Sequence, residues 1–173
     1  MRNRFWPGVL LLTIGWTLPT RAASVSATSE VVTVEVRTAR PAPAFSLVTV
    51  EGEKFSSATL TGKAAVVTFW ASQDKPSVRQ LTELVALQTQ FGAERLAVVG
   101  IAVDTNELRS VIAARQVNFP VLLVDLPVIQ GFGGLQAIPT TYVIDKNYNI
   151  IQQYTGFAEK GAIEKDIEAI QRQ

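Results

Sequence analysis

Two continuous apolar segments flank a stretch with helical periodicity, and this order constrains the fold more than any other feature of the chain. Residues 64–70 and 96–103 are almost entirely apolar, as in strands that are buried on both faces of a sheet. Between them, apolar side chains recur at intervals of three and four from Pro76 to Phe91. The chain is therefore predicted to be an α/β protein in which an amphipathic helix joins two buried strands.

The rest of the chain extends this pattern in both directions. Asp104 is predicted to be the N-cap of a second helix that ends near Gln116, because it opens a polar run with a glutamate in the first turn. The other expected elements are strands, a helical turn and a last helix, at residues 32–36, 45–50, 54–56, 120–124, 127–132, 140–145, 150–154 and 163–170. Strands that alternate with helices and end in an antiparallel pair predict a mixed central sheet with helices on both faces and an N-terminal β-hairpin.

The first residues have the layout of a secretory signal peptide. Arg2 and Arg4 precede an apolar stretch at 5–18, which is followed by small residues. The expected organisation is a signal at 1–22, a leader at 23–40 that contains an extra strand, and one domain at 41–173. The chain is therefore predicted to be periplasmic or otherwise secreted and soluble after cleavage, with membrane contact only if the signal is not removed.

The composition excludes several kinds of chemistry. The chain contains no cysteine and no histidine, so a Ser-His-Asp triad, a thiol nucleophile and a thiolate zinc site are all impossible. Three of the 16 basic side chains lie in residues 1–22, which leaves 13 basic against 15 acidic side chains and a net charge of −2 after cleavage. This charge argues against nucleic acid as a partner, and no metal or cofactor is expected.

Six blocks in a fixed order resemble the TlpA/ResA-type thioredoxin-like family, to which the AhpC/TSA peroxiredoxins are related. The similarity extends over roughly residues 41–171, and the resemblance implies a thioredoxin-like fold. The blocks are Pro43-Ala44-Phe45-Ser46-Leu47, Leu60-Thr61-Gly62-Lys63, Val67-Thr68-Phe69-Trp70-Ala71-Ser72, Val99-Gly100-Ile101-Ala102-Val103-Asp104, Phe119-Pro120-Val121 and Ile138-Pro139-Thr140-Thr141-Tyr142-Val143-Ile144-Asp145.

The resemblance implies a Trp-Cys-x-x-Cys redox motif, and its positions are filled here by other residues. Gln73 stands at the tryptophan, Asp74 and Ser77 stand at the two cysteines, and Lys75 and Pro76 lie between them. Neither Asp74 nor Ser77 can form a disulfide. Asp74 is instead predicted to cap the helix, and no catalytic residue is expected.

Two further positions follow from the same resemblance. Gln80 takes the place of a glutamate that the ResA branch carries. Pro139 corresponds to a cis-proline that faces the redox motif, and in the family the backbone before it pairs with an extended peptide. Trp70, Gln73, Ile138 and Pro139, with the loop 131–134, are therefore candidates for a peptide groove. An alternative of equal weight is that Pro139 only shapes the turn into its strand.

These observations predict a redox-inactive thioredoxin-like protein that binds a protein or peptide in an extracytoplasmic compartment, as an accessory or assembly factor. One alternative is an enzyme of a thiol-disulfide or peroxiredoxin-like pathway that uses carboxylates such as Asp74. The other is a structural role in the envelope, in which the strand at 32–36 pairs with another chain.

Overall fold

The computed structural model describes residues 32–34 and 39–173. The expected signal at 1–22 and most of the expected leader lie outside these residues. The elements, in chain order, are β1 (Val32–Val34), β2 (Arg40–Pro41), β3 (Ser46–Val48), β4 (Lys54–Ser56), η1 (Ser57–Leu60), β5 (Ala64–Trp70), α1 (Lys75–Phe91), β6 (Leu96–Ala102), α2 (Leu108–Ala114), β7 (Val121–Leu123), α3 (Leu126–Gly131), β8 (Thr140–Ile144), β9 (Asn149–Thr155) and α4 (Lys160–Gln171).

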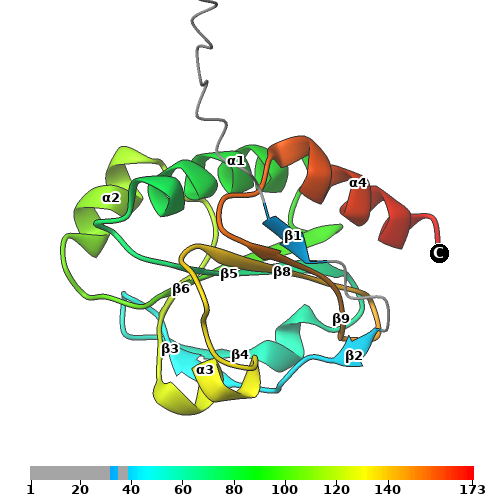
Figure 1. The fold of residues 1–173 in the computed structure, drawn as a ribbon, viewed down its shortest axis with the longest axis horizontal. Helices are drawn as coiled ribbons and strands as arrows, with labels where there is room; N and C mark the ends of the chain where they lie inside the picture. The colour runs from blue at the N-terminus through cyan, green and yellow to red at the C-terminus, as the bar shows by residue number, and fades with distance from the viewer. Residues whose placement is uncertain (1–31, 35–38) are drawn as a thin grey trace, which may run out of the picture.

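The elements form a seven-stranded mixed sheet in the order β1-β9-β8-β5-β6-β7, with β2 also paired to β9 (Figure 1). The strands β5, β6 and β7 are parallel to one another, whereas β8, β9, β1 and β2 join by antiparallel pairing. The hairpin β3–β4 forms a second, two-stranded sheet. The predicted mixed sheet, the hairpin and the described part of the N-terminal strand are therefore confirmed.

Two apolar clusters hold helices on opposite faces of the sheet. In Figure 1, α1, α2 and α4 lie on one side of the sheet, and α3 lies with the β3–β4 hairpin on the other. The first cluster joins Leu81, Leu84 and the isoleucines of α4 to the sheet. The second contains an aromatic group in which the Phe132 ring lies 5.2 Å from Phe69 and 4.8 Å from Tyr142 between centroids. All seven residues of β5 are buried, as its apolar run predicts.

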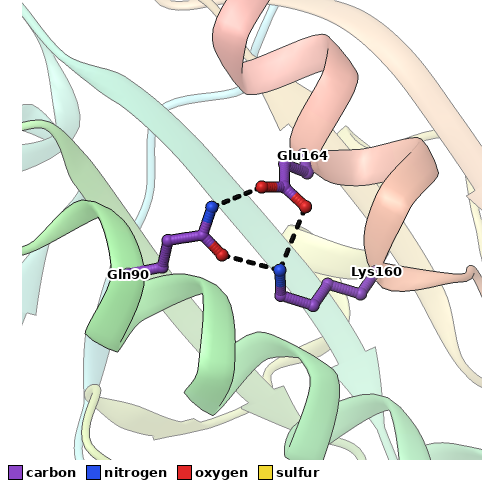
Figure 2. Close-up of polar contacts among 3 residues, drawn as sticks. All are labelled: Gln90, Lys160 and Glu164. Carbon is purple, nitrogen blue, oxygen red and sulfur yellow. Dashed lines mark hydrogen bonds and ion pairs between the residues drawn. The ribbon is translucent and has the colours of Figure 1, made fainter.

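The helices α1 and α4 are linked by polar contacts as well as by packing. Lys160 Nζ donates to Gln90 Oε1 at 2.6 Å and to Glu164 Oε2 at 3.0 Å, and Gln90 Nε2 donates to the other oxygen of Glu164 (Figure 2). These hydrogen bonds from Gln90 and then from Lys160 lower the pKa of Glu164. The cluster is close to solvent, so it adds little to stability.

Gly100 in β6 makes room for the indole of Trp70, and this predicts a matched pair of glycine substitutions. A Cβ at position 100 would lie 3.1 Å from Trp70 Nε1 and 3.4 Å from Phe119 Cε2, inside a packed core. Gly100→Ala is expected to lower the free energy of unfolding by about 1–3 kcal/mol through overpacking. Gly161→Ala in α4, where a Cβ meets no atom within 4 Å, should raise it by up to about 1 kcal/mol. Urea unfolding of both variants checks the pair, and equal effects would contradict this account of the packing.

Tyr154 and Asp166 connect β9 to α4 and predict a pH-dependent effect on stability. The Tyr154 hydroxyl donates to Asp166 Oδ2 at 2.6 Å. Burial raises the pKa of Asp166 above its usual value, while the hydrogen bond from Tyr154 opposes that rise. A raised carboxyl pKa means that Asp166 favours the folded state most below its unfolded pKa of 3.8, and that this contribution is lost as pH rises through the folded pKa.

Tyr154→Phe removes the hydrogen bond that favours the charged carboxylate, so the pKa of Asp166 should rise further. The cost of the substitution is therefore expected to be about 1.5–3 kcal/mol at pH 7 and clearly smaller near pH 3.5, because the bond favours the ionised carboxylate and the ionised fraction falls with pH. Urea unfolding at the two pH values measures this difference. A cost that is larger at the acidic pH would show that the bond does not act on the ionised form.

Candidate functional site

The start of α1 is built from the residues that stand at the redox-motif positions. Asp74 is the N-cap, and its carboxylate accepts the Ser77 backbone N–H at 2.8 Å. Pro76 lies in the first turn, where no intrahelical N–H is needed. The structure confirms the predicted capping role of Asp74, which is worth on the order of 1 kcal/mol to the helix. The carboxylate is thus already engaged by the helix end.

Ser77 points inward rather than toward a reaction partner. The residue has no exposed surface, and its hydroxyl accepts the backbone N–H of Ala71 at 3.3 Å. Lys75 and Pro76, between the two positions, are exposed. At the positions of the redox motif, Lys75 and Pro76 therefore face solvent. Asp74 and Ser77 instead make hydrogen bonds that connect the loop before α1 to the helix.

The loop before α1 is fastened to the loop that follows β6. Trp70 and Ala102 pair at the ends of the parallel strands β5 and β6, so the residues just beyond them meet. Asp104 Oδ2 accepts the Ser72 backbone N–H at 2.9 Å and lies 3.0 Å from the Ser72 hydroxyl, which also contacts the backbone oxygen of Asn106. Asp104 is consequently not the cap of α2, and that prediction is wrong.

The second helix begins later than its polar start predicts. Glu107 is at the N-cap position of α2 with φ 50°, and its side chain makes no capping hydrogen bond. Instead, Glu107 Oε2 accepts from Gln73 Nε2 at 3.0 Å. The contacts of Glu107 with Gln73 and of Asp104 with Ser72 show that tertiary partners have replaced the expected local cap.

The second turn of α1 contacts the segment that leaves β9. Gln80 is fully buried, and its Oε1 accepts the Ala158 backbone N–H at 2.7 Å, whereas its Nε2 has no partner among the described residues. Arg79 stacks on the Phe157 ring, with Cζ 3.9 Å from the centroid, and forms an ion pair with Glu159 at 3.3 Å. No periodicity in the sequence links residues 79–80 to 157–159, so these contacts were not predicted.

The proline segment lies at the same end of the sheet as the start of α1. Phe69 pairs with Thr140, which places Pro139 level with Trp70. The Ile138–Pro139 bond is cis, as the resemblance implies, and Pro139 O accepts the Gly156 N–H at 2.8 Å. Ile138 is partly exposed, and within residues 39–173 its backbone N–H and C=O have no hydrogen-bond partner.

Several candidates for the groove lie inside the core instead. Trp70 is fully buried, with its indole against Gly100 and Phe119, so it exposes no surface to a peptide. Within the loop 131–134, Phe132 is 1% exposed and belongs to the aromatic group. Both are large apolar side chains at the ends of elements, and the sheet provides enough apolar surface to bury them. Pro139 is buried as well, whereas Gln73, Ile138 and the three glycines of the loop 131–134 remain accessible.

Three features are absent, two from the described residues and one from the whole chain. In residues 39–173, no cluster of three or more acidic side chains is arranged to hold a metal ion. None of the described helices is long and apolar enough to cross a membrane. Since the whole chain has no cysteine, neither Asp74 nor any other residue can exchange a disulfide.

A capped helix that follows a buried strand, beside a cis-proline at the start of an antiparallel strand, defines a thioredoxin-like protein. The comparisons with known proteins agree with this class. The model of the AhpC/TSA family matches residues 38–153, and the chain belongs to that family.

Individual relatives carry thiol-disulfide or thioredoxin-like names. The chain is 28% identical over 177 residues to the thioredoxin-like protein YneN of Bacillus subtilis, in an alignment that covers 97% of this chain and 99% of YneN. It is 28% identical over 165 residues to the thiol-disulfide oxidoreductase ResA of Geobacillus kaustophilus, covering 94% and 90%. A thiol:disulfide interchange protein of Chlorobium tepidum has a similar structure, with a TM-score of 0.71, 31% identity, and coverage of 77% and 97%.

Proposed function

We propose that this chain is an exported, redox-inert member of its family that binds an extended segment of a protein or peptide beside Ile138. The observation that carries the proposal is the unpaired backbone of Ile138, whose N–H and C=O lack partners within residues 39–173 while the side chain is partly exposed. An extended peptide satisfies such groups by strand addition, which needs no cysteine.

The surroundings of Ile138 support a binding surface rather than a reaction centre. Gln73 is exposed at the same end of the sheet, and its amide is held by Glu107. The Gly156 N–H donates a hydrogen bond to Pro139 O. The next residue, Phe157, packs its ring against the Arg79 guanidinium. The carboxylate of Asp74 is engaged as a helix cap and has no imidazole or thiol nearby to work with. The signal-like pattern in residues 1–22 supports export.

Site-specific crosslinking in the native compartment tests the proposal. A photoreactive residue at Gln73 is expected to capture a discrete partner, whereas the same probe at Lys165, exposed on α4, should not. Ile138→Glu, which places a charge in the groove, should abolish the capture. Gln136→Glu adds the same charge at an exposed position of the same loop and should leave it intact.

Two results would overturn this function. Equal crosslinking from Gln73 and Lys165, or capture that survives Ile138→Glu, would remove the groove from consideration. Reduction of insulin disulfides or of a peroxide by the purified chain, at a rate comparable to that of an authentic family member, would show that the protein is an enzyme after all.

One observation favours a structural role as a second candidate. β1 stands at one end of the strand order, so its outer side is unpaired among the described residues and is open to a strand of another chain. Deletion of residues 24–38 should then abolish assembly but leave crosslinking from Gln73 unchanged. Loss of both activities together would instead show that the deletion damages the fold.

A further inference from the structure

The exposed apolar side chains of the described residues gather at one edge of the sheet, away from Ile138. The large ones are Val48, Leu123 and Leu126, which are 43%, 36% and 64% exposed. Val48 ends β3, Leu123 ends the edge strand β7, and Leu126 begins α3. A cluster of this kind at an edge, with no comparable side chain elsewhere in residues 39–173, marks an interaction surface more than chance exposure.

The backbone pairing places two of these side chains side by side. Thr49 and Leu122 form an antiparallel bridge, and Val50 N–H donates to Val121 O at 2.9 Å. Val48 is therefore opposite Leu123, and Val50 shares its face because residues two apart point the same way. The bridge also occupies the edge of β7, so a partner meets side chains here rather than open backbone groups.

The same face continues into a hollow of about 350 Å³. Val50, Leu108 and Leu123 supply its apolar lining. Its remaining lining residues are polar and exposed: Thr105, Glu107, Arg109 and Ser110. An apolar hollow with a polar rim is the usual form of a site that receives one side chain of a ligand.

Of the two charged residues at the rim, Glu107 has a side-chain partner and Arg109 has none among the described residues, so Arg109 is the charged group left to meet a ligand. Arg109 Nη2 donates to Val50 O at 3.1 Å, which holds the guanidinium over the hollow, and Arg109 has no carboxylate partner among the described residues. Lys54 lies opposite Val48 across the hairpin and is exposed. Glu107 is engaged by Gln73, and Glu53 pairs with Thr49 on the other face of the hairpin.

We infer that this surface, formed by Val48, Val50, Leu108, Arg109 and Leu123, binds a short segment of another protein that carries a leucine-like side chain next to a carboxylate. The apolar side chain enters the hollow, and the carboxylate pairs with Arg109. A second copy of this chain is a poor occupant, because a standard dimer buries about 800 Å² on each partner and the surface consists of a few side chains. This site is independent of the groove at Ile138.

The test is a titration of the ¹⁵N-labelled full chain with blocked peptides, followed by NMR. The peptide acetyl-Leu-Leu-Glu-amide is expected to shift the amide signals of Val50, Leu108 and Leu123 in a saturable manner. The peptide acetyl-Leu-Leu-Lys-amide should bind about two- to fivefold more weakly, as expected for an exposed ion pair. Arg109→Gln should remove this preference, and Leu123→Ser should weaken both peptides by about tenfold or more.

Lys165→Gln, which removes a positive charge on α4, serves as the control and should change neither affinity. The inference is overturned if the shifts map elsewhere, if the two peptides bind equally to the unsubstituted chain, or if Leu123→Ser binds as tightly as the parent. Self-association that rises with protein concentration and is abolished by Leu123→Ser would also overturn it, since the occupant would then be a second copy.

Discussion

Replacement of Asp74 and Ser77 together by cysteine is expected to turn this cysteine-free chain into a thiol-disulfide reductase. The two positions are separated by one helical turn, in which Cα atoms three residues apart lie about 5 Å from each other, within the range that a disulfide bridges. The Ser77 backbone N–H now donates a hydrogen bond to the Asp74 carboxylate at 2.8 Å. In the variant, the same N–H would donate to the sulfur at position 74. That donor and the helix dipole favour the thiolate, so the pKa of the thiol introduced by Asp74→Cys should fall below the ordinary thiol value of about 8.5.

The measurement is the reduction of insulin by dithiothreitol in the presence of the full-length double variant. Reduction is expected to be clearly faster than with the parent chain. The sulfur that replaces Asp74 is the more accessible of the two, and its thiolate absorbance should titrate below about pH 8. The single variants Asp74→Cys and Ser77→Cys are the controls and should remain close to background, since each lacks the second sulfur. A double variant that forms its disulfide but does not act on insulin would contradict this prediction and show that the scaffold does not bring a disulfide substrate to the introduced thiols.

Gln88→Leu is expected to destabilise the fold more than either Gly100→Ala or Tyr154→Phe. β7 pairs only with residues 100–102 of β6, which leaves the outer edge of the first half of β6 without a strand. Gln88 fills this gap from α1: its Nε2 donates to Leu96 O at 3.1 Å, and its Oε1 accepts the Val98 N–H at 3.0 Å. The side-chain amide of Gln88 thus makes the two hydrogen bonds that a peptide group of a neighbouring strand would make with β6.

Leucine at position 88 leaves both backbone groups unpaired, at a cost of about 1–3 kcal/mol each. Gln88 also borders a hollow of about 220 Å³ that admits water, so the total loss is expected to be about 2–4 kcal/mol. Urea unfolding measures it. Gln90→Leu, two residues further along the same helix and exposed, should cost less than about 1 kcal/mol. Equal losses for the two variants would show that the edge of β6 does not depend on Gln88.

The sequence predicted those parts of the fold that depend on periodicity and burial. The apolar run of β5 and the helical spacing of α1 specify their elements because each pattern suits only one kind of packing. Asp74 was predictable as a cap since its position before a proline-containing first turn is a local signal.

The parts that could not be predicted depend on residues that are distant in the chain. Asp104 also has a local signal for a helix cap, a glutamate three residues later, yet its carboxylate accepts the backbone N–H of Ser72, 32 residues earlier in the chain. Trp70 was a candidate for the peptide groove, but its ring is buried, and Gly100 on the neighbouring strand leaves space for it. Gln88 belongs to the helix by periodicity, but its use as a strand substitute follows only from the shortness of β7.

The pairing of β1 and β2 with β9 also bears on how the chain reaches its fold. Val32 lies opposite Thr155, and Arg40 lies opposite Ile150, so the first strands find their partner more than a hundred residues later. Contacts of such long sequence separation form slowly and late. During synthesis, β1 and β2 have no partner strand until β9 has been made, close to the end of the chain. Until then, the nascent protein is most exposed to pairing with the strands of other chains.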